Sequence, residues 1–145
     1  MGYEYTYKCM ECGKEIELIE GIGMMWHSFN KDMFYPPKKG CFGLNFYDMF
    51  DKNTLNKIHK FIEESQEVFI DDAYYQPYIC NKCGQIESKL YFIMYGINSG
   101  TTKYFRIRYS CKCGGKYKKL LNKDIESLNC QCGGKMIRTS LLCWD

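Results

Sequence analysis

The sequence has no long apolar run. None of its hydrophobic stretches approaches the roughly 18 residues that a helix needs to cross a bilayer, because Lys, Glu or Gly interrupts each one within a few positions. The segment Met1–Lys8 also lacks the apolar core and the small-residue cleavage site of a secretory signal. We therefore expect a soluble protein in a reducing compartment, the cytoplasm, with no membrane partner.

Histidine is also scarce, since only His27 and His59 are present. A catalytic zinc keeps an open coordination position and usually has His or a carboxylate among its ligands. His59 falls within a predicted helix and His27 within an aromatic stretch, where surface and packing roles are expected. No activated nucleophile, phosphate-binding loop or cofactor motif stands out. The sequence thus predicts a protein that is not an enzyme and has no small-molecule substrate.

Cysteine, in contrast, is abundant, with ten residues in a chain of 145. Eight of them form four close pairs, and a glycine follows each pair directly. The pairs are Cys9/Cys12 and Cys80/Cys83, with two residues between the thiols, and Cys111/Cys113 and Cys130/Cys132, with one. Glycine permits the positive φ that a chain bending back around a bound sulfur tends to need. The pairs therefore predict metal-binding knuckles, whereas Cys41 and Cys143 are expected to be buried thiols without a metal.

The flanks of the knuckles suggest how the pairs combine. Residues 7–16 are similar to residues 78–87, and residues 110–116 are similar to residues 129–135. If similar knuckles pair, the first site is Cys9, Cys12, Cys80 and Cys83, and the second is Cys111, Cys113, Cys130 and Cys132. An alternative joins Cys80/Cys83 to Cys111/Cys113 across 27 residues and leaves the outer pairs to each other. Because four thiolates suit a closed tetrahedral site, two Zn²⁺ ions are the predicted cofactors.

The Cys-x-x-Cys-Gly segments at 9–13 and 80–84 resemble the paired knuckles of zinc-ribbon and rubredoxin-like proteins, among them small bacterial ones. The Cys-x-Cys-Gly-Gly segments resemble a shortened relative. This resemblance covers the cysteine-bearing third of the chain and implies a fold rather than a role. The chain departs from rubredoxins because its second knuckle lacks proline and a long insertion separates the two. A rubredoxin-like iron centre for electron transfer in the first site is an alternative to zinc.

The segments between the knuckles carry further structure. Leu55, Ile58 and Ile62 recur at helical spacing and predict a helix over about residues 52–68. Strands are expected at residues 90–95 and 104–109, as a hairpin that bridges the two metal sites. In its second strand Phe105, Ile107 and Tyr109 would face the core, and Arg106 and Arg108 would face water.

The predicted fold class is α+β: two zinc ribbons, each with four cysteine ligands, built from short antiparallel strands. The first zinc ribbon would occupy residues 1–102 and contain an aromatic and helical insertion at about residues 13–79. The second, basic zinc ribbon would occupy residues 103–145.

Charge is distributed unevenly, with a net charge of −4 over residues 1–102 and +7 over residues 103–145. In the basic part, lysines and arginines interleave with tyrosines, a mixture that suits phosphate contacts and base stacking. The candidate nucleic-acid-binding residues are Lys103, Arg106, Arg108, Lys112, Lys116, Lys118 and Lys119. A solvated lysine-rich surface is the other interpretation, since lysine outnumbers arginine 17 to 3 in a composition typical of an AT-rich bacterial genome.

We therefore expect a structural-zinc binding module whose basic C-terminal ribbon contacts nucleic acid. In the main alternative, the aromatic insertion docks another protein and the basic surface serves solubility alone.

Overall fold

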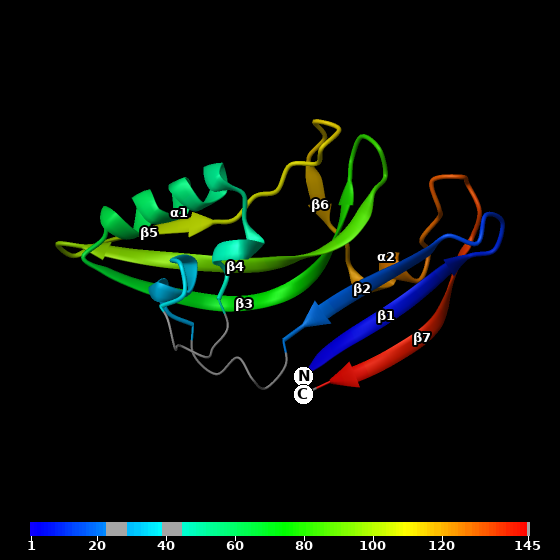
Figure 1. Cartoon of the computed structure of the whole chain (residues 1–145), viewed down its shortest axis with the longest axis horizontal. Coiled ribbons are helices and arrows are strands. Elements are labelled where there is room, and N and C mark those ends of the chain that lie inside the picture. Colours follow the sequence, from blue (N-terminus) through cyan, green and yellow to red (C-terminus); the bar gives the residue numbers. More distant parts are fainter. Residues whose placement is uncertain (23–28, 39–44, 145) are drawn as a thin grey trace. The chain divides into compact units, whose positions relative to one another are not determined.

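The computed structural model describes residues 1–22, 29–38 and 45–144 (Figure 1). These residues form two compact units. The first unit contains residues 1–22, 74–91 and 108–144, and the second contains residues 29–38, 45–73 and 92–107. The sequence suggested one boundary after residue 102, whereas the chain passes repeatedly from one unit to the other.

Antiparallel strands dominate the described residues. The strands are β1 (Gly2–Cys9), β2 (Glu15–Gly21), β3 (Glu67–Cys80), β4 (Ile86–Asn98), β5 (Thr101–Arg106), β6 (Tyr117–Lys119) and β7 (Met136–Trp144). In this part of the chain they form one seven-stranded sheet in the order β5-β4-β3-β2-β1-β7, with β6 also paired to β3.

This sheet overturns the predicted α+β fold of two small zinc ribbons. Strands β3 and β4 are 14 and 13 residues long, far longer than the short strands expected around each knuckle. Both are rich in the aromatic and β-branched residues that favour extended backbone. The segment before Cys80, which was assigned to an insertion, is therefore largely a strand of the sheet.

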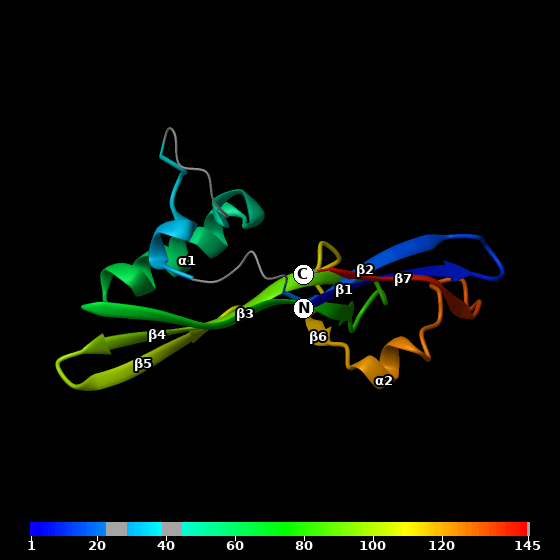
Figure 2. The same ribbon diagram turned by 90° about the horizontal axis from the view of Figure 1, so that it is seen from below.

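The core of the first unit lies between β1, β2, β7 and the short helix α2 (Asn122–Ile125). Its buried members are Tyr7, Cys9, Leu18, Leu120, Ile125, Leu128 and Met136. Gln76 on β3 is also buried, and its Nε2 donates a hydrogen bond to the Leu120 carbonyl at 2.7 Å. At the edge, Gly2 of β1 lies opposite Trp144 of β7, so the two ends of the chain lie side by side (Figures 1 and 2).

The second unit has a phenylalanine-rich core of its own. Helix α1 (Lys52–Glu63) and the short 3₁₀ helix η1 (Lys31–Phe34) lie on the same side of the β4–β5 hairpin, as Figure 2 shows. A second 3₁₀ helix, η2 (Tyr47–Met49), precedes α1. Phe34, Phe46 and Phe92 are fully buried, and the ring centroids of Phe34 and Phe92 lie 5.1 Å apart.

The predicted apolar face of α1 is confirmed, because Leu55, Ile58 and Ile62 are its buried residues. The helix ends at Glu63 rather than near residue 68, since β3 begins at Glu67. His59 on this helix is half-buried: its Nε2 lies 2.7 Å from the Phe34 carbonyl oxygen, and its ring stacks on Tyr35. Both contacts lie in the packing of the second unit and neither involves a cysteine.

The predicted hairpin exists as β4 and β5, but its bounds differ from the prediction. Strand β4 begins at Ile86 rather than residue 90, and β5 runs from Thr101 to Arg106 rather than over residues 104–109. Asn98 pairs with Thr101, so only Ser99 and Gly100 form the turn, and both have positive φ (45° and 80°). This is the type I′ geometry that matches the twist of the strands. The predicted burial pattern is seen at residues 106–108, where Ile107 is buried and Arg106 and Arg108 are exposed, although Ile107 and Arg108 lie beyond the end of β5.

None of the helices in the described part of the chain has the length and hydropathy needed to span a membrane. His27 and Cys41 lie outside the described residues, so their predicted roles stay predictions. Cys143 is exposed on β7, which corrects the expectation that it is buried.

Candidate metal centres

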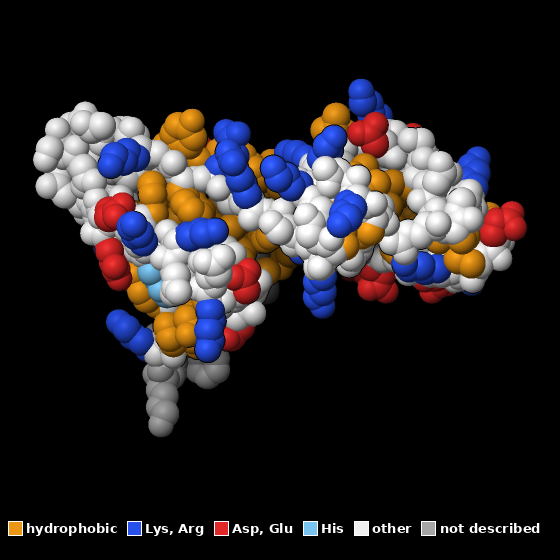
Figure 3. Space-filling model, turned by 90° about the horizontal axis from the view of Figure 1, so that it is seen from above, with side chains coloured by type: hydrophobic (Ala, Val, Ile, Leu, Met, Phe, Trp, Pro, Cys, Tyr) orange, Lys and Arg blue, Asp and Glu red, His pale blue; other side chains and the backbone are white. Residues whose placement is uncertain are grey.

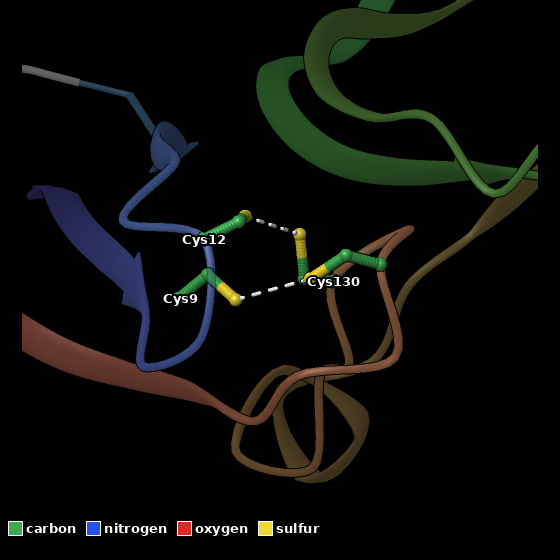
Figure 4. A group of neighbouring side chains, drawn as sticks. Cys9, Cys12 and Cys130 are labelled. Carbon is green, nitrogen blue, oxygen red and sulfur yellow. Dashed lines mark hydrogen bonds between the residues drawn. The ribbon is translucent and has the colours of Figure 1, made fainter.

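The four knuckles bring eight cysteine sulfurs together in two groups. We call Cys9, Cys12, Cys130 and Cys132 the outer centre, and Cys80, Cys83, Cys111 and Cys113 the inner centre. Within each centre the four sulfur atoms all lie within 4.8 Å of one another. In Figure 4 the Cys9 and Cys12 side chains reach across to the knuckle that carries Cys130.

The preferred pairing of similar knuckles is therefore wrong, and the alternative pairing is the one observed. Each centre combines one Cys-x-x-Cys knuckle with one Cys-x-Cys knuckle. Strand pairing explains this choice: β7 follows Cys132 and places Met136 opposite Cys9, whereas β6 follows Cys113 and places Tyr117 opposite Cys80. The similar flanks thus mark a repeated arrangement of strands and knuckles, not a shared site. Along the sequence, the β4–β5 hairpin connects the two knuckles of the inner centre, so it does not bridge the two centres as predicted.

The sulfur positions suit a tetrahedral ion. Between the paired knuckles, Cys9 Sγ lies 3.5 Å from Cys132 Sγ and Cys12 Sγ lies 3.6 Å from Cys130 Sγ in the outer centre, and the Sγ distances are 3.5 Å for Cys80–Cys113 and 3.7 Å for Cys83–Cys111 in the inner centre. A disulfide would need about 2.05 Å, so these sulfurs are not bonded to each other. A zinc–sulfur distance of about 2.3 Å corresponds to a tetrahedron with edges of about 3.8 Å. Each centre could therefore hold one metal ion.

The two Cys-x-x-Cys knuckles are built alike. In the outer knuckle the Cys9 N–H donates to the Lys14 carbonyl at 2.9 Å, and the Gly13 N–H donates to the Cys9 carbonyl at 3.1 Å. The inner knuckle repeats both bonds with Cys80, Gln85 and Gly84, at 2.8 and 3.0 Å. Gly13 and Gly84 both have φ of +71°, as the sequence predicted for the glycine after each pair.

The two Cys-x-Cys knuckles are also alike, and each is tied to its partner knuckle through the backbone. The Met10 N–H donates to the Lys135 carbonyl, and the Asn81 N–H donates to the Lys116 carbonyl, both at 3.0 Å. The second glycine of each Gly-Gly pair, Gly115 or Gly134, is buried. Only the first glycine of each pair entered the prediction from sequence, although the repeated Gly-Gly was visible and could have identified the second.

Backbone donors and neighbouring sulfurs act in opposite directions on the thiols. Hydrogen bonds from backbone N–H groups, chiefly that of Cys12, lower the pKa of Cys9 to about 6. At Cys111 the chief cause is the N–H of Cys113, and the pKa is again lowered to about 6. At Cys132 the Gly134 N–H lowers the pKa, but the three neighbouring sulfurs together raise it to about 12. Without a cation, each thiolate thus makes deprotonation of the neighbouring thiols less favourable, because like charges repel. A divalent ion would offset this repulsion for all four sulfurs.

The surroundings of the centres differ in charge. The inner knuckles carry Lys82, Lys112 and Lys116, all exposed, and Lys82 Nζ donates to the Cys113 carbonyl at 3.1 Å. The corresponding positions of the outer knuckles are Glu11, Gln131 and Lys135. The inner centre is therefore the more basic of the two.

The seven candidate nucleic-acid-binding residues are all exposed but do not share one unit. Lys103 and Arg106 belong to β5 in the second unit, and the other five belong to the first. Lys119 Nζ lies 5.2 Å from the ring centroids of both Tyr74 and Tyr91, so its ammonium group packs on these rings. On the face shown in Figure 3, Lys and Arg side chains are spread among acidic and hydrophobic ones.

No protein-family model, curated protein or solved structure matches this chain. The fold and the cysteines therefore define its class. It is an antiparallel-sheet protein with two four-cysteine groups, each of which could hold one metal ion.

Proposed function

We propose that the protein is a structural zinc-binding module that holds one Zn²⁺ in each centre. The observation that supports this proposal is the convergence of four sulfurs within 4.8 Å at each of two places. Four thiolates fill a tetrahedral coordination sphere and leave no open position for a substrate, which favours a structural over a catalytic metal. Since the thiols must be reduced to bind zinc, the proposal requires a reducing compartment such as the cytoplasm.

Native mass spectrometry and elemental analysis of the purified protein test this proposal. We expect two zinc ions per chain and eight cysteines protected from alkylation until a chelator is added. A fully reduced chain that binds no metal and whose eight knuckle cysteines react at once would overturn it. If the metal is iron instead, the sample is coloured by iron–thiolate absorption, and the protein becomes a candidate electron carrier.

We further propose that the surface around the inner centre contacts nucleic acid. Lys82, Lys112 and Lys116 support this because they are exposed on both knuckles of one centre, where bound metal would hold their backbone rigid. Ammonium groups so placed can neutralise phosphates and release their counterions. The outer centre, with Glu11 and Gln131 at two of the equivalent positions, lacks this charge.

Fluorescence anisotropy with single- and double-stranded oligonucleotides over a range of salt concentrations tests this contact. The variant in which Lys82, Lys112 and Lys116 are all changed to Ala should bind at least about 10-fold more weakly. Its slope of log K against log salt concentration should be shallower by an amount that corresponds to the loss of about two phosphate contacts. The matched control changes three exposed lysines of α1, Lys52, Lys57 and Lys60, to Ala and should bind as the natural chain does. Zinc content must be unchanged in both variants.

If the natural protein binds neither DNA nor RNA at low salt, the nucleic-acid proposal is wrong. The metal proposal does not depend on it. The remaining function would then be an adaptor that binds another protein.

A further inference from the structure

The side chain of Gln131 connects the two centres. Gln131 is the middle residue of Cys130-Gln-Cys132 in the outer centre, and its Nε2 donates a hydrogen bond to the carbonyl oxygen of Cys83 in the inner centre at 3.0 Å. Its Oε1 accepts a hydrogen bond from Lys14 Nζ at 3.4 Å. The amide is thus bonded to both Cys-x-x-Cys knuckles, one through a backbone carbonyl and one through a side chain.

The two centres also share the wall of one cavity. A cavity of about 400 Å³ is lined by Gly84 and Gln85, which follow the inner knuckle, and by Asn129, Cys130 and Gln131 of the outer centre. Beside this cavity, the hydrogen bond from the Gln131 amide to the Cys83 carbonyl is a direct contact between a knuckle of the outer centre and a knuckle of the inner centre.

We propose that Gln131 couples the two centres, so that metal bound in the outer centre raises the affinity of the inner centre for metal. This inference rests on the proposed function, since it requires both centres to bind. Metal held by Cys130 and Cys132 fixes the backbone of Gln131 between them. The amide is then in place to hold the Cys83 carbonyl, and the inner knuckle has less conformational freedom left to lose when it binds its own ion.

The coupling is reciprocal by thermodynamic necessity, so metal in the inner centre favours metal in the outer centre by the same factor. A single neutral hydrogen bond of ordinary net strength corresponds to about a 2- to 10-fold change in affinity. Partly loaded chains are then less abundant than two independent centres would allow.

The repeated build of the centres offers a matched control. Lys112 is the middle residue of Cys111-Lys-Cys113, so its position in the inner centre is equivalent to that of Gln131 in the outer centre. The Lys112 side chain is exposed. Changing Lys112 to Ala therefore alters the same knuckle position without removing the link between the centres. Gln131→Glu is a second test variant, because it keeps the length of the side chain but cannot donate to the Cys83 carbonyl.

The experiment is a zinc titration of the reduced full chain against a competing chelator, with zero-, one- and two-zinc chains counted by native mass spectrometry. The readout is the product of the zero- and two-zinc populations divided by the square of the one-zinc population, which does not depend on the free zinc concentration. We expect this ratio to fall about 2- to 10-fold in Gln131→Ala and Gln131→Glu and to stay unchanged in Lys112→Ala.

An unchanged ratio in both Gln131 variants, or an equal fall in Lys112→Ala, overturns the coupling while the two-zinc function stands. A natural chain that never carries two zinc ions overturns the proposed function, and the coupling with it. The two failures are therefore distinguished by the natural chain alone.

Discussion

The backbone of Gly115 packs directly against the sulfur of Cys80. A β-carbon at Gly115 would lie 2.5 Å from Cys80 Sγ, closer than side-chain atoms can approach. The same relationship recurs in the outer centre, where a β-carbon at Gly134 would lie 2.7 Å from Cys9 Sγ. The second glycine of each Cys-x-Cys-Gly-Gly knuckle therefore makes room for the first sulfur of the partner knuckle.

Changing either glycine to alanine should weaken one centre selectively. We expect Gly115→Ala to release the inner metal at chelator concentrations that the natural protein withstands, because overpacking of this kind costs about 1–3 kcal/mol. Gly134→Ala should have the corresponding effect on the outer metal. Each variant is the control for the other, and alkylation of the cysteines followed by mass spectrometry identifies the emptied centre. Equal labelling of both centres in either variant would contradict the assignment.

The observed pairing of the knuckles makes a second prediction. Cys113→Ser should remove one zinc ion and expose Cys80, Cys83 and Cys111 to alkylation, because these four residues form one centre. The four cysteines of the outer centre should remain protected. If the labelled residues were instead Cys111, Cys130 and Cys132, similar knuckles would pair after all.

Chelation should affect the two units differently. Both centres lie in the first unit, whereas Phe34, Ile58 and Phe92 form a buried core in the second. Structural zinc contributes roughly 10–16 kcal/mol of apparent binding free energy in small domains, so its removal should unfold the first unit. Hydrogen exchange should show lost protection in residues 2–21 and 136–144 and retained protection in residues 55–62. Equal loss in both regions would mean that the second unit does not fold without metal.

Asp51 caps α1, and its effect should depend on pH. Its carboxylate accepts hydrogen bonds from the backbone N–H of Thr54 at 2.9 Å and from the Thr54 hydroxyl at 2.8 Å, which lower the Asp51 pKa. Since the folded pKa lies below the unfolded one, this stabilisation is present above about pH 4 and is lost as the pH falls through the folded pKa.

At neutral pH we expect Asp51→Ala to lower the free energy of unfolding by about 1 kcal/mol, measured by urea denaturation with excess zinc. Asp51→Asn is the control, because it keeps a capping acceptor that does not titrate. Titration of the Asp51 carboxyl by NMR should give a lower pKa in the native chain than in urea. Identical values in the two states would show that the cap does not form.

The type I′ turn between β4 and β5 predicts two substitutions of opposite sign. Gly100 has φ of +80°, and a β-carbon added there would meet no other atom within 4 Å, so Gly100→Ala should cost about 1–2 kcal/mol through backbone strain alone. Ser99→Asn should instead stabilise the protein, because Asn-Gly is the preferred pair in this turn. Urea denaturation at saturating zinc measures both, and a stabilising Gly100→Ala would contradict the turn assignment.

Local chemistry was readable from the sequence wherever neighbouring residues decide the conformation. The knuckle glycines and the buried face of Leu55, Ile58 and Ile62 both depend on contacts within a few residues. The end of α1 and the length of β3 were missed, because strand pairing over the whole sheet extends β3 back to Glu67 and so ends the helical region early.

The sequence by itself determined which cysteines form knuckles and that each knuckle needs a glycine with positive φ. Which knuckles meet was decided only by the tertiary structure. Loop-closure entropy grows slowly with length, so spacing along the chain discriminates poorly between a 27-residue and a far longer connection. The choice came from strand partners: β7 pairs with β1 and brings Cys130 and Cys132 to Cys9 and Cys12, from the opposite end of the chain.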